Sequence, residues 1–235
     1  YGTPDRTENH SYSSRAANHC GADVYGTGDC PACLYNSAGR ERYNIGGEKM
    51  KPAKIFNDIL DGGYNRTWLG AEWKKVDGWL LFQQSKGKQD WFFNLLSAIK
   101  IPGKLNGKKF IFPLGFWCLL KTLEKVIQTE TFIALGGYSQ GGPYASYGSA
   151  VTGLPAVTFG CPGIGIGDAD LFKNVTHYKT PTDIVYELPP WAEHYGQTIV
   201  LQGEFIPKPG MSVAEYAEML TGHTPKEYRQ RLKNE

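Results

Sequence analysis

The sequence Gly-Tyr-Ser-Gln-Gly at residues 137–141 places one serine, Ser139, between two glycines. This pattern is typical of a nucleophile elbow, in which an exposed serine projects above a sheet on a sharp strand-to-helix turn. Gly137 and Gly141 remove the side chains that would clash in such a turn. The N–H of Gln140, at the start of the following helix, would point toward a carbonyl under attack as one half of an oxyanion hole. Such a site performs acyl transfer.

The context of the elbow matters, because a chain with 29 glycines produces this short pattern by chance at an appreciable rate. Residues 131–135 have the β-branched and apolar composition of a strand. The stretch before them has helical periodicity, with its apolar residues on one stripe: Phe116, Leu119, Leu120, Leu123 and Ile127. The order helix, strand, elbow, helix is the one that an α/β protein with a nucleophilic serine requires.

A serine hydroxyl needs an imidazole to accept its proton and a carboxylate to orient that imidazole. Three histidines follow the elbow: His177, His194 and His223. His177 falls within an expected strand, where packing is its simpler role. His194 stays an alternative. His223 lies in a loop directly before a helix that a capping box, Thr224 with Glu227, starts at Pro225, and this position suits a catalytic base.

The candidate acid is Asp183, which follows the expected strand at residues 175–178 and a Thr-Pro turn. Asp168 and Asp170 lie earlier in a glycine-rich loop, where a turn or a helix cap explains them as well. In α/β-hydrolases the acid precedes the histidine along the chain, as Asp183 precedes His223.

These motifs together resemble the class 3 lipases, a fungal-lipase-like family of α/β-hydrolases. The elbow is followed by Val-Thr-Phe-Gly-Cys-Pro-Gly-Ile-Gly at 157–165 and by Thr-Asp-Ile-Val-Tyr-Glu-Leu-Pro-Pro at 182–190, both similar to family motifs. Residues 12–20, Leu-Gly-Phe at 114–116, and His223 with Tyr228 extend the likeness over nearly the whole chain. The resemblance implies a mostly parallel central sheet flanked by helices, and a triad of Ser139, Asp183 and His223.

The resemblance also implies that the residue at Ser85 supplies the second oxyanion-hole N–H, beside that of Gln140. Residues 81–91 match the family motif that ends in Asp-Trp, but Gln83-Gln84 replaces the usual Arg-Gly. A side chain in place of glycine narrows the approach to Ser85. Tyr138 stands where a histidine commonly precedes the nucleophile, which changes the support of the triad.

The resulting hypothesis is a serine carboxylester hydrolase, a lipase or esterase that cleaves acylglycerol-type or related esters through an acyl-enzyme. It requires no metal and no organic cofactor. Two alternatives stay open: a feruloyl or polysaccharide-ester esterase on the same fold, and a catalytically degenerate hydrolase that serves as a binding or structural module. Residues 91–101 are apolar enough for a lid over the acyl site, and a buried core helix explains them equally well.

Composition limits the partners and the compartment. With 25 basic and 23 acidic residues, the net charge of +2 gives no sign of a nucleic-acid partner. The expected partners are a small-molecule or lipid ester and, transiently, a lipid interface, and no apolar stretch is long enough for a transmembrane helix. Three glycosylation sequons begin at Asn9, Asn65 and Asn174, so the expected location leans toward secreted.

A chain of 235 residues fits one domain. We expect a single α/β-hydrolase domain over residues 1–235, with residues 1–50 as an N-terminal helix and wrapping segment. Cys20, Cys30 and Cys33 lie in that segment and leave a disulfide or free thiols open, whereas zinc is disfavoured because His19 and Cys20 are adjacent. Cys118 and Cys161 are expected in the core.

Overall fold

The computed structural model describes residues 51–83, 96–203 and 222–234, and these residues belong to one compact unit. The N-terminal helix and wrapping segment expected within residues 1–50 lie outside the described residues. A single domain over residues 1–235 therefore stays a prediction.

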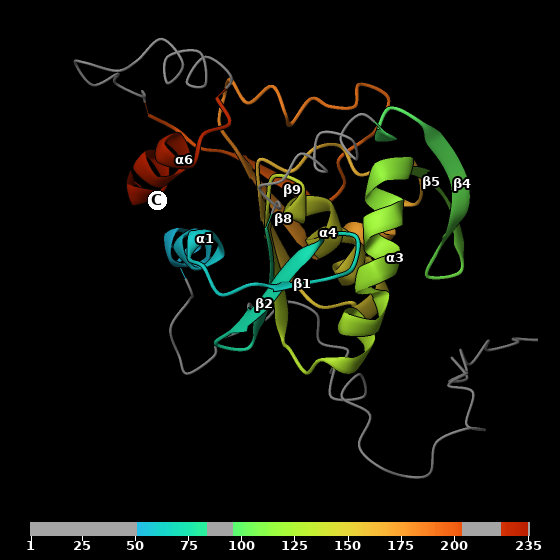
Figure 1. Cartoon of the computed structure of the whole chain (residues 1–235). Coiled ribbons are helices and arrows are strands. Elements are labelled where there is room, and N and C mark those ends of the chain that lie inside the picture. The colour runs from blue at the N-terminus through green and yellow to red at the C-terminus, as the bar shows by residue number, and fades with distance from the viewer. Residues whose placement is uncertain (1–50, 84–95, 204–221, 235) are drawn as a thin grey trace, which may run out of the picture. The chain divides into compact units, whose positions relative to one another are not determined.

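In the described ranges the main sheet has seven strands in the order β1-β2-β3-β6-β7-β8-β9 (Figure 1). Their bounds are Asn65–Arg66, Glu72–Val76, Trp79–Gln83, Ala134–Tyr138, Ala156–Phe159, Val175–Lys179 and Gln197–Val200. The pairs β1–β2 and β2–β3 are antiparallel, and every neighbouring pair from β3 to β9 is parallel. Parallel neighbours need crossovers that cover the sheet faces. The expected α/β architecture with a mostly parallel central sheet is confirmed.

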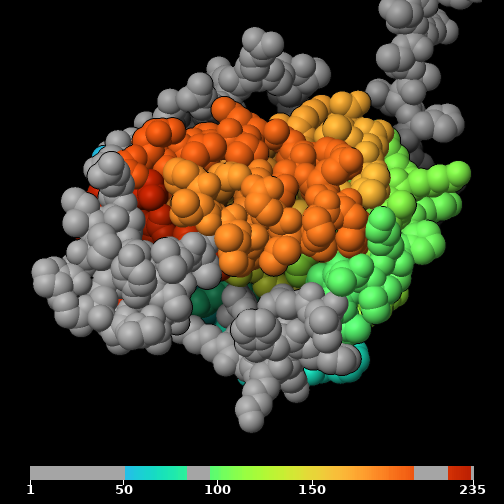
Figure 2. Space-filling view, turned by 90° about the horizontal axis from the view of Figure 1, so that it is seen from above, coloured from blue at the N-terminus to red at the C-terminus, as the bar shows by residue number. Residues whose placement is uncertain are grey.

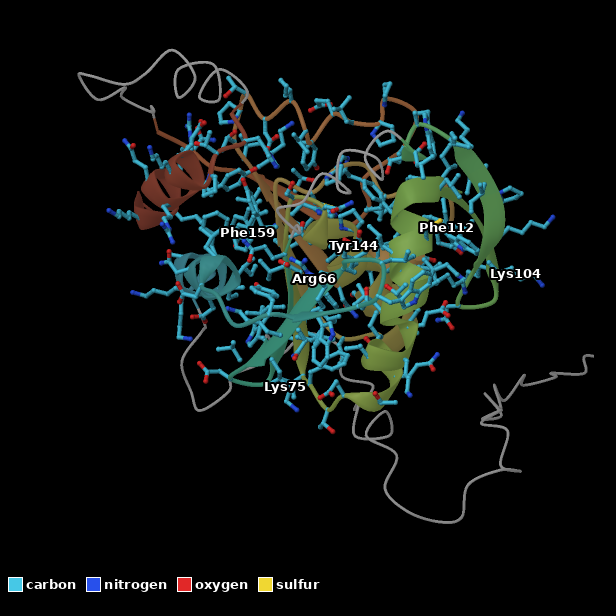
Figure 3. The ribbon with its side chains drawn as sticks, in the orientation of Figure 1. Arg66, Lys75, Lys104, Phe112, Tyr144 and Phe159 are labelled. Atoms are coloured by element: carbon cyan, nitrogen blue, oxygen red, sulfur yellow. The ribbon has the colours of Figure 1, made fainter. Side chains whose placement is uncertain are left out.

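Helices cover both faces of this sheet, α1 and α6 on one and α3 and α4 on the other (Figure 1). The helices span Pro52–Leu60 (α1), Leu114–Thr129 (α3), Gly141–Thr152 (α4) and Pro225–Arg231 (α6), with short 3₁₀ helices at Ala169–Phe172 (η2) and Leu232–Asn234 (η3). Phe159 lies on the α1 and α6 side, whereas Tyr144 and Phe112 lie on the α3 side (Figure 3). Within the described ranges, the helices are too short or too polar to cross a bilayer.

The two faces have separate hydrophobic clusters, and β3 and β6 contribute to both. Leu81 and Tyr138 belong to the cluster under α1 and α6, and Leu80 and Leu135 to the one under α3 and α4. All residues of β3 and β6 are buried. This burial on both faces explains why these strands, apart from Gln83, are apolar or small in sequence instead of alternating.

A two-stranded hairpin of β4 (Lys100–Leu105) and β5 (Lys108–Pro113) was not anticipated from the sequence. Its strands join through Asn106-Gly107, and both residues have positive φ, 47° and 76°. Asn-Gly is a strong signal for a tight hairpin turn, so the sequence carried the information. The expected lid segment at 91–101 lies outside the described residues up to 95, and its last two residues belong to β4.

Other elements agree with the sequence to within a few residues. The strand expected at 131–135 is β6, three residues later, because the small Gly136 and Gly137 are strand residues with neighbours closely packed on both sides. Helix α6 begins at Pro225 as expected, and the Thr224 hydroxyl accepts a hydrogen bond from the Glu227 N–H. The Glu227 carboxylate pairs with Arg231 instead of completing the capping box.

His177 lies in β8, fully buried, as its place in a strand predicted. Its Nε2–H donates to the Tyr195 carbonyl at 2.8 Å, so its Nδ1 accepts from the Thr158 hydroxyl at 2.6 Å. Burial, with a smaller effect of His194, lowers the pKa of His177 to about 3. The imidazole is therefore neutral in the folded protein.

This pKa shift makes stability fall in acid. The unfolded chain protonates His177 below about pH 6.5 while the folded chain does not, so the contribution is complete above that pH and is lost as pH falls toward the folded pKa. We expect the free energy of unfolding in urea to fall by about 1.4 kcal/mol per pH unit from this residue. The His177→Gln variant should have a flatter pH dependence, and an identical one would contradict the assignment.

Candidate active site

The nucleophile elbow lies where β6 ends and α4 begins. Ser139 has a φ of 54°, in the left-handed region that residues other than glycine rarely adopt. Its N–H donates to the Phe159 carbonyl of β7 at 2.9 Å, and its carbonyl accepts from Gly142 N–H at the same distance. The turn is therefore held by the neighbouring strand and by the first turn of the helix.

The two glycines of the pattern are sterically required. A Cβ atom on Gly137 would lie 2.2 Å from the Gly141 carbonyl oxygen, and one on Gly141 would lie 2.3 Å from the Phe82 carbonyl oxygen. Both contacts are with backbone, which cannot move aside without breaking the sheet or the helix. The reason given from the sequence for these glycines is confirmed.

The structure brings together the three side chains expected to form a triad. The distance from His223 Nε2 to Ser139 Oγ is 2.9 Å, and His223 Nδ1 lies 3.0 Å from each carboxylate oxygen of Asp183. Nδ1 is the donor toward the carboxylate, which leaves Nε2 to accept from the serine hydroxyl. One expectation was wrong: Ser139 is only 5% exposed.

The Asp183 carboxylate, 2% exposed, has donors on both oxygens. Its Oδ1 accepts from the N–H groups of Val185 and Tyr186, at 2.9 and 3.2 Å. Its Oδ2 accepts from the Tyr228 hydroxyl at 2.6 Å. Burial, and then the charge of Asp183, raise the pKa of Tyr228 well above its ordinary value, so the phenol keeps its proton and remains a donor. These donors compensate the buried charge and fix the carboxylate plane.

The loop that carries His223 is held closely at its start. Gly222 has a φ of 63°, and its carbonyl accepts from the Thr180 hydroxyl at 2.6 Å. Gly160, after β7, has a φ of 53°, and a Cβ atom there would lie 2.7 Å from His223 Cε1 and 2.8 Å from Asp183 Oδ2. The space for the imidazole and the carboxylate therefore depends on the missing side chain at Gly160.

The rejected candidates have other partners. His194 donates from Nε2 to the Cys161 carbonyl at 2.9 Å and stacks on Tyr186 with ring centroids 3.7 Å apart. Burial lowers its pKa. Asp168 caps the η2 helix by accepting from Asp170 N–H and pairs with Lys108 at 2.5 Å. His194 and Asp168 are thus occupied in structural contacts.

Of the two expected oxyanion-hole residues, the structure describes Gln140 and not Ser85. Gln140 is the N-cap of α4 and is 4% exposed, so its main chain lies at the helix end where N–H groups have no intrahelical acceptor. Ser85 lies outside the described residues. Gln83 is the last residue of β3 and is 8% exposed. The end of β3 lies next to the first turn of α4, because the Phe82 carbonyl packs against Gly141.

The loop that follows Asp183 contacts segments from distant parts of the chain. Figure 2 looks down on the segments after β8, coloured orange, beside the green residues of the β4–β5 hairpin. The Trp191 indole N–H donates to the Ala98 carbonyl at 3.1 Å, and Lys100 Nζ lies 5.1 Å from the Trp191 ring centroid. The hairpin that the sequence did not predict therefore supports the loop that follows Asp183.

The described part of the chain contains no group of three or more His, Cys, Asp or Glu side chains that could hold a metal ion. Cys20, Cys30 and Cys33 lie outside the described residues. Cys161 is buried and Cys118 half-buried, both as free thiols, in agreement with their expected place in the core.

Sequence reasoning missed the contacts that position the Asp183 and His223 side chains. The Tyr228 hydroxyl on Asp183 joins residues 45 positions apart, and the place of Gly160 against His223 depends on three-dimensional packing. A signal did exist for Tyr228, since it lies five residues after His223 on a helix whose start was predicted. No sequence pattern separates Gly160 from the other glycines of its loop.

No protein-family model and no curated protein matches this chain. Among solved structures, it is similar to the Rhizomucor miehei lipase propeptide complex, with 20% identity, 59% of this chain and 56% of that chain covered, and a TM-score of 0.40. It is also similar to Yarrowia lipolytica Lip2 lipase, with 16% identity, 59% of this chain and 64% of that chain covered, and a TM-score of 0.43. A third similar structure is Aspergillus oryzae mono- and diacylglycerol lipase, with 17% identity, 51% of this chain and 52% of that chain covered, and a TM-score of 0.34. The matched part thus spans between half and two thirds of each lipase, and likeness at this level assigns no activity.

The packing of Gly160 against the His223 and Asp183 side chains yields a prediction. We expect Gly160→Ala to lower the free energy of unfolding by about 1–3 kcal/mol more than Gly153→Ala does. Both glycines have positive φ, but a Cβ on Gly153 would meet nothing within 4 Å. Urea unfolding of the two variants separates the clash from the backbone strain, and equal losses would show that the space at Gly160 is not needed.

Proposed function

We propose that this protein is a serine carboxylester hydrolase that cleaves acylglycerol-type or related esters through an acyl-enzyme. One observation carries the proposal: a single imidazole, His223, lies within hydrogen-bond reach of both the Ser139 hydroxyl, at 2.9 Å, and the Asp183 carboxylate, at 3.0 Å. This is the relation of nucleophile, base and orienting acid that activates a serine.

In the proposed mechanism, Ser139 Oγ attacks the ester carbonyl while His223 Nε2 accepts its proton. The Asp183 carboxylate holds the Nδ1–H of His223, so that the imidazole keeps the tautomer that accepts at Nε2 and is stabilised once it becomes cationic. The imidazolium then protonates the departing alkoxide. Water, deprotonated by His223, attacks the acyl-enzyme and releases the acid, which restores Ser139.

The tetrahedral intermediate carries a negative charge that needs donors. We propose the main-chain N–H of Gln140 as one donor, supported by its place at the N-terminus of α4, where the helix dipole also favours an anion. The N–H of Ser85, aided by its hydroxyl, is the proposed second donor. Loss of one such donor typically costs about 3 kcal/mol of transition-state stabilisation, or two to three orders of magnitude in rate.

The proposed nucleophile can be tested by substitution of Ser139. Ser139→Ala should abolish ester hydrolysis and covalent labelling by a fluorophosphonate, because only an activated serine reacts with this probe. Labelling also measures access, since Ser139 is only 5% exposed. Mass spectrometry of the labelled peptide gives the position of the adduct.

A matched control is Ser149→Ala, which removes another buried serine hydroxyl, one that donates to the Leu154 carbonyl at 2.6 Å. It should label and hydrolyse like the unaltered protein. Unchanged esterase activity in Ser139→Ala, or an adduct on another residue, would refute the nucleophile. A folded protein that neither labels nor hydrolyses p-nitrophenyl esters would refute the proposed function.

The contact of Tyr228 with Asp183, the proposed acid, can also be tested. Tyr228→Phe removes the hydroxyl that donates to Asp183 Oδ2 at 2.6 Å, in a site where the carboxylate is buried. A hydrogen bond to a charged group contributes about 1.5–3 kcal/mol, so we expect kcat to fall by about tenfold to a hundredfold. Tyr64→Phe is the control, because its hydroxyl donates to the distant Ile59 carbonyl. Equal kcat values in the two variants would show that Tyr228 does not orient the acid.

A further inference from the structure

Tyr138, the residue before the nucleophile, contacts the proposed base with its side chain. It is the last residue of β6, it is 6% exposed, and its main chain continues directly into the Ser139 turn. Its side chain lies on the α1 and α6 side of the sheet, within the hydrophobic cluster that includes Tyr228. The same residue therefore adjoins the nucleophile through the chain and the base through space.

The first contact is between rings. The phenol of Tyr138 and the imidazole of His223 are nearly parallel, with an interplanar angle of 14° and centroids 5.2 Å apart. A flat ring against the imidazole face resists rotation of that imidazole about its side-chain bonds. The hydrogen bonds of His223 to Asp183 and Ser139 lie in the imidazole plane, so this face contact restrains a motion that those bonds leave least restricted.

The second contact is with the main chain. The Tyr138 hydroxyl donates a hydrogen bond to the carbonyl oxygen of His223, 85 residues later in sequence. This bond fixes the backbone of the loop at the base itself. With the Thr180 hydroxyl on the Gly222 carbonyl, two successive carbonyl groups of this loop are tied to residues of the sheet and its adjoining loops.

Tyr138 is itself held in place by aromatic neighbours. Phe56 of α1 meets its ring edge-on, with centroids 5.3 Å apart and an interplanar angle of 88°. Tyr228 meets it at 5.9 Å and 71°, and donates to Asp183 with its own hydroxyl. This packing restricts the movement of the Tyr138 side chain, so that its ring and hydroxyl meet His223 from a defined position.

We propose that Tyr138 is a positioning residue that sets the orientation of the catalytic base relative to the nucleophile; this inference rests on the proposed function. The phenol restrains the imidazole plane and the hydroxyl restrains the loop backbone. The aromatic face also attracts the positive charge that His223 acquires when it takes the Ser139 proton. Tyr138 acts through His223.

The test compares three substitutions of buried tyrosines. Tyr138→Phe removes the hydroxyl and keeps the ring, and Tyr138→Leu removes both. Tyr147→Phe is the matched control, because its buried hydroxyl also donates to a main-chain carbonyl, that of Ile164 on the other face of the sheet. Folding of each variant is checked by thermal unfolding before kinetics.

We expect kcat for p-nitrophenyl esters to fall by roughly tenfold in Tyr138→Phe and by a hundredfold or more in Tyr138→Leu, with KM within about twofold of the unaltered protein. The rate of fluorophosphonate labelling should fall in the same order. Partial retention by the conservative Phe variant separates the ring contact from the hydroxyl bond. A Tyr138→Phe and a Tyr138→Leu that both match Tyr147→Phe in kcat would overturn the proposal.

A second measurement does not depend on activity. The stacked phenol shifts the NMR resonance of the His223 Cε1 proton upfield, and comparison with His223→Asn assigns that resonance. We expect it to stay in place in Tyr138→Phe and to move downfield in Tyr138→Leu; no movement in the Leu variant would show that the stack is absent. If the unaltered protein is not labelled by the fluorophosphonate, the proposed function itself is refuted. If it is labelled normally and the Tyr138 variants keep its kcat and labelling rate, only the inference about Tyr138 is refuted.

Discussion

The whole site depends on one sharp turn of the backbone at Ser139. A non-glycine residue held at a φ of 54° is strained by about 1–2 kcal/mol, and it persists only where packing leaves no alternative. Here the packing is between backbones: Gly137 against Gly141, and Gly141 against Phe82, with no room for a Cβ atom in either place. Close approach of β3, β6 and α4 therefore fixes the turn, and the turn fixes the direction of the serine side chain.

The parallel sheet explains how the other two groups reach that serine. β6, β7 and β8 are adjacent and parallel, so the segments that follow them leave the sheet at the same edge. Ser139 follows β6, Gly160 follows β7, and Asp183 lies four residues beyond the end of β8. Gly160 has no side chain, which leaves the volume that the His223 imidazole fills. Three segments, distant in sequence, meet because adjacent strands end together, and the His223 loop joins them through hydrogen bonds from Thr180 and Tyr138.

Much of this arrangement could be predicted from the sequence, and the limits have physical causes. Local signals sufficed for the turn at Ser139 and for the helix start at Pro225, because turns and caps depend on a few neighbouring residues. The expected place of His223 beside Ser139 agrees with the 2.9 Å between their side chains. The β4–β5 hairpin was missed although Asn106-Gly107 signalled it. The burial of Ser139, the Tyr228 hydroxyl on Asp183 and the need for Gly160 are contacts between distant segments, which no local pattern encodes.

Because side chains alternate along β6, Tyr138 lies on the sheet face from which it contacts His223, the proposed base. Ala134 and Tyr138 point to the α1 and α6 side, and Leu135 points to the α3 and α4 side. Ser139 follows a residue that faces α6, and His223 lies in the loop that leads into α6, two residues before its first turn. A shift of β6 by one residue would turn Tyr138 toward α4 and leave His223 without its stacked ring. The helices α3 and α4 thus hold the elbow from one side, while the aromatic cluster under α1 and α6 holds the base from the other.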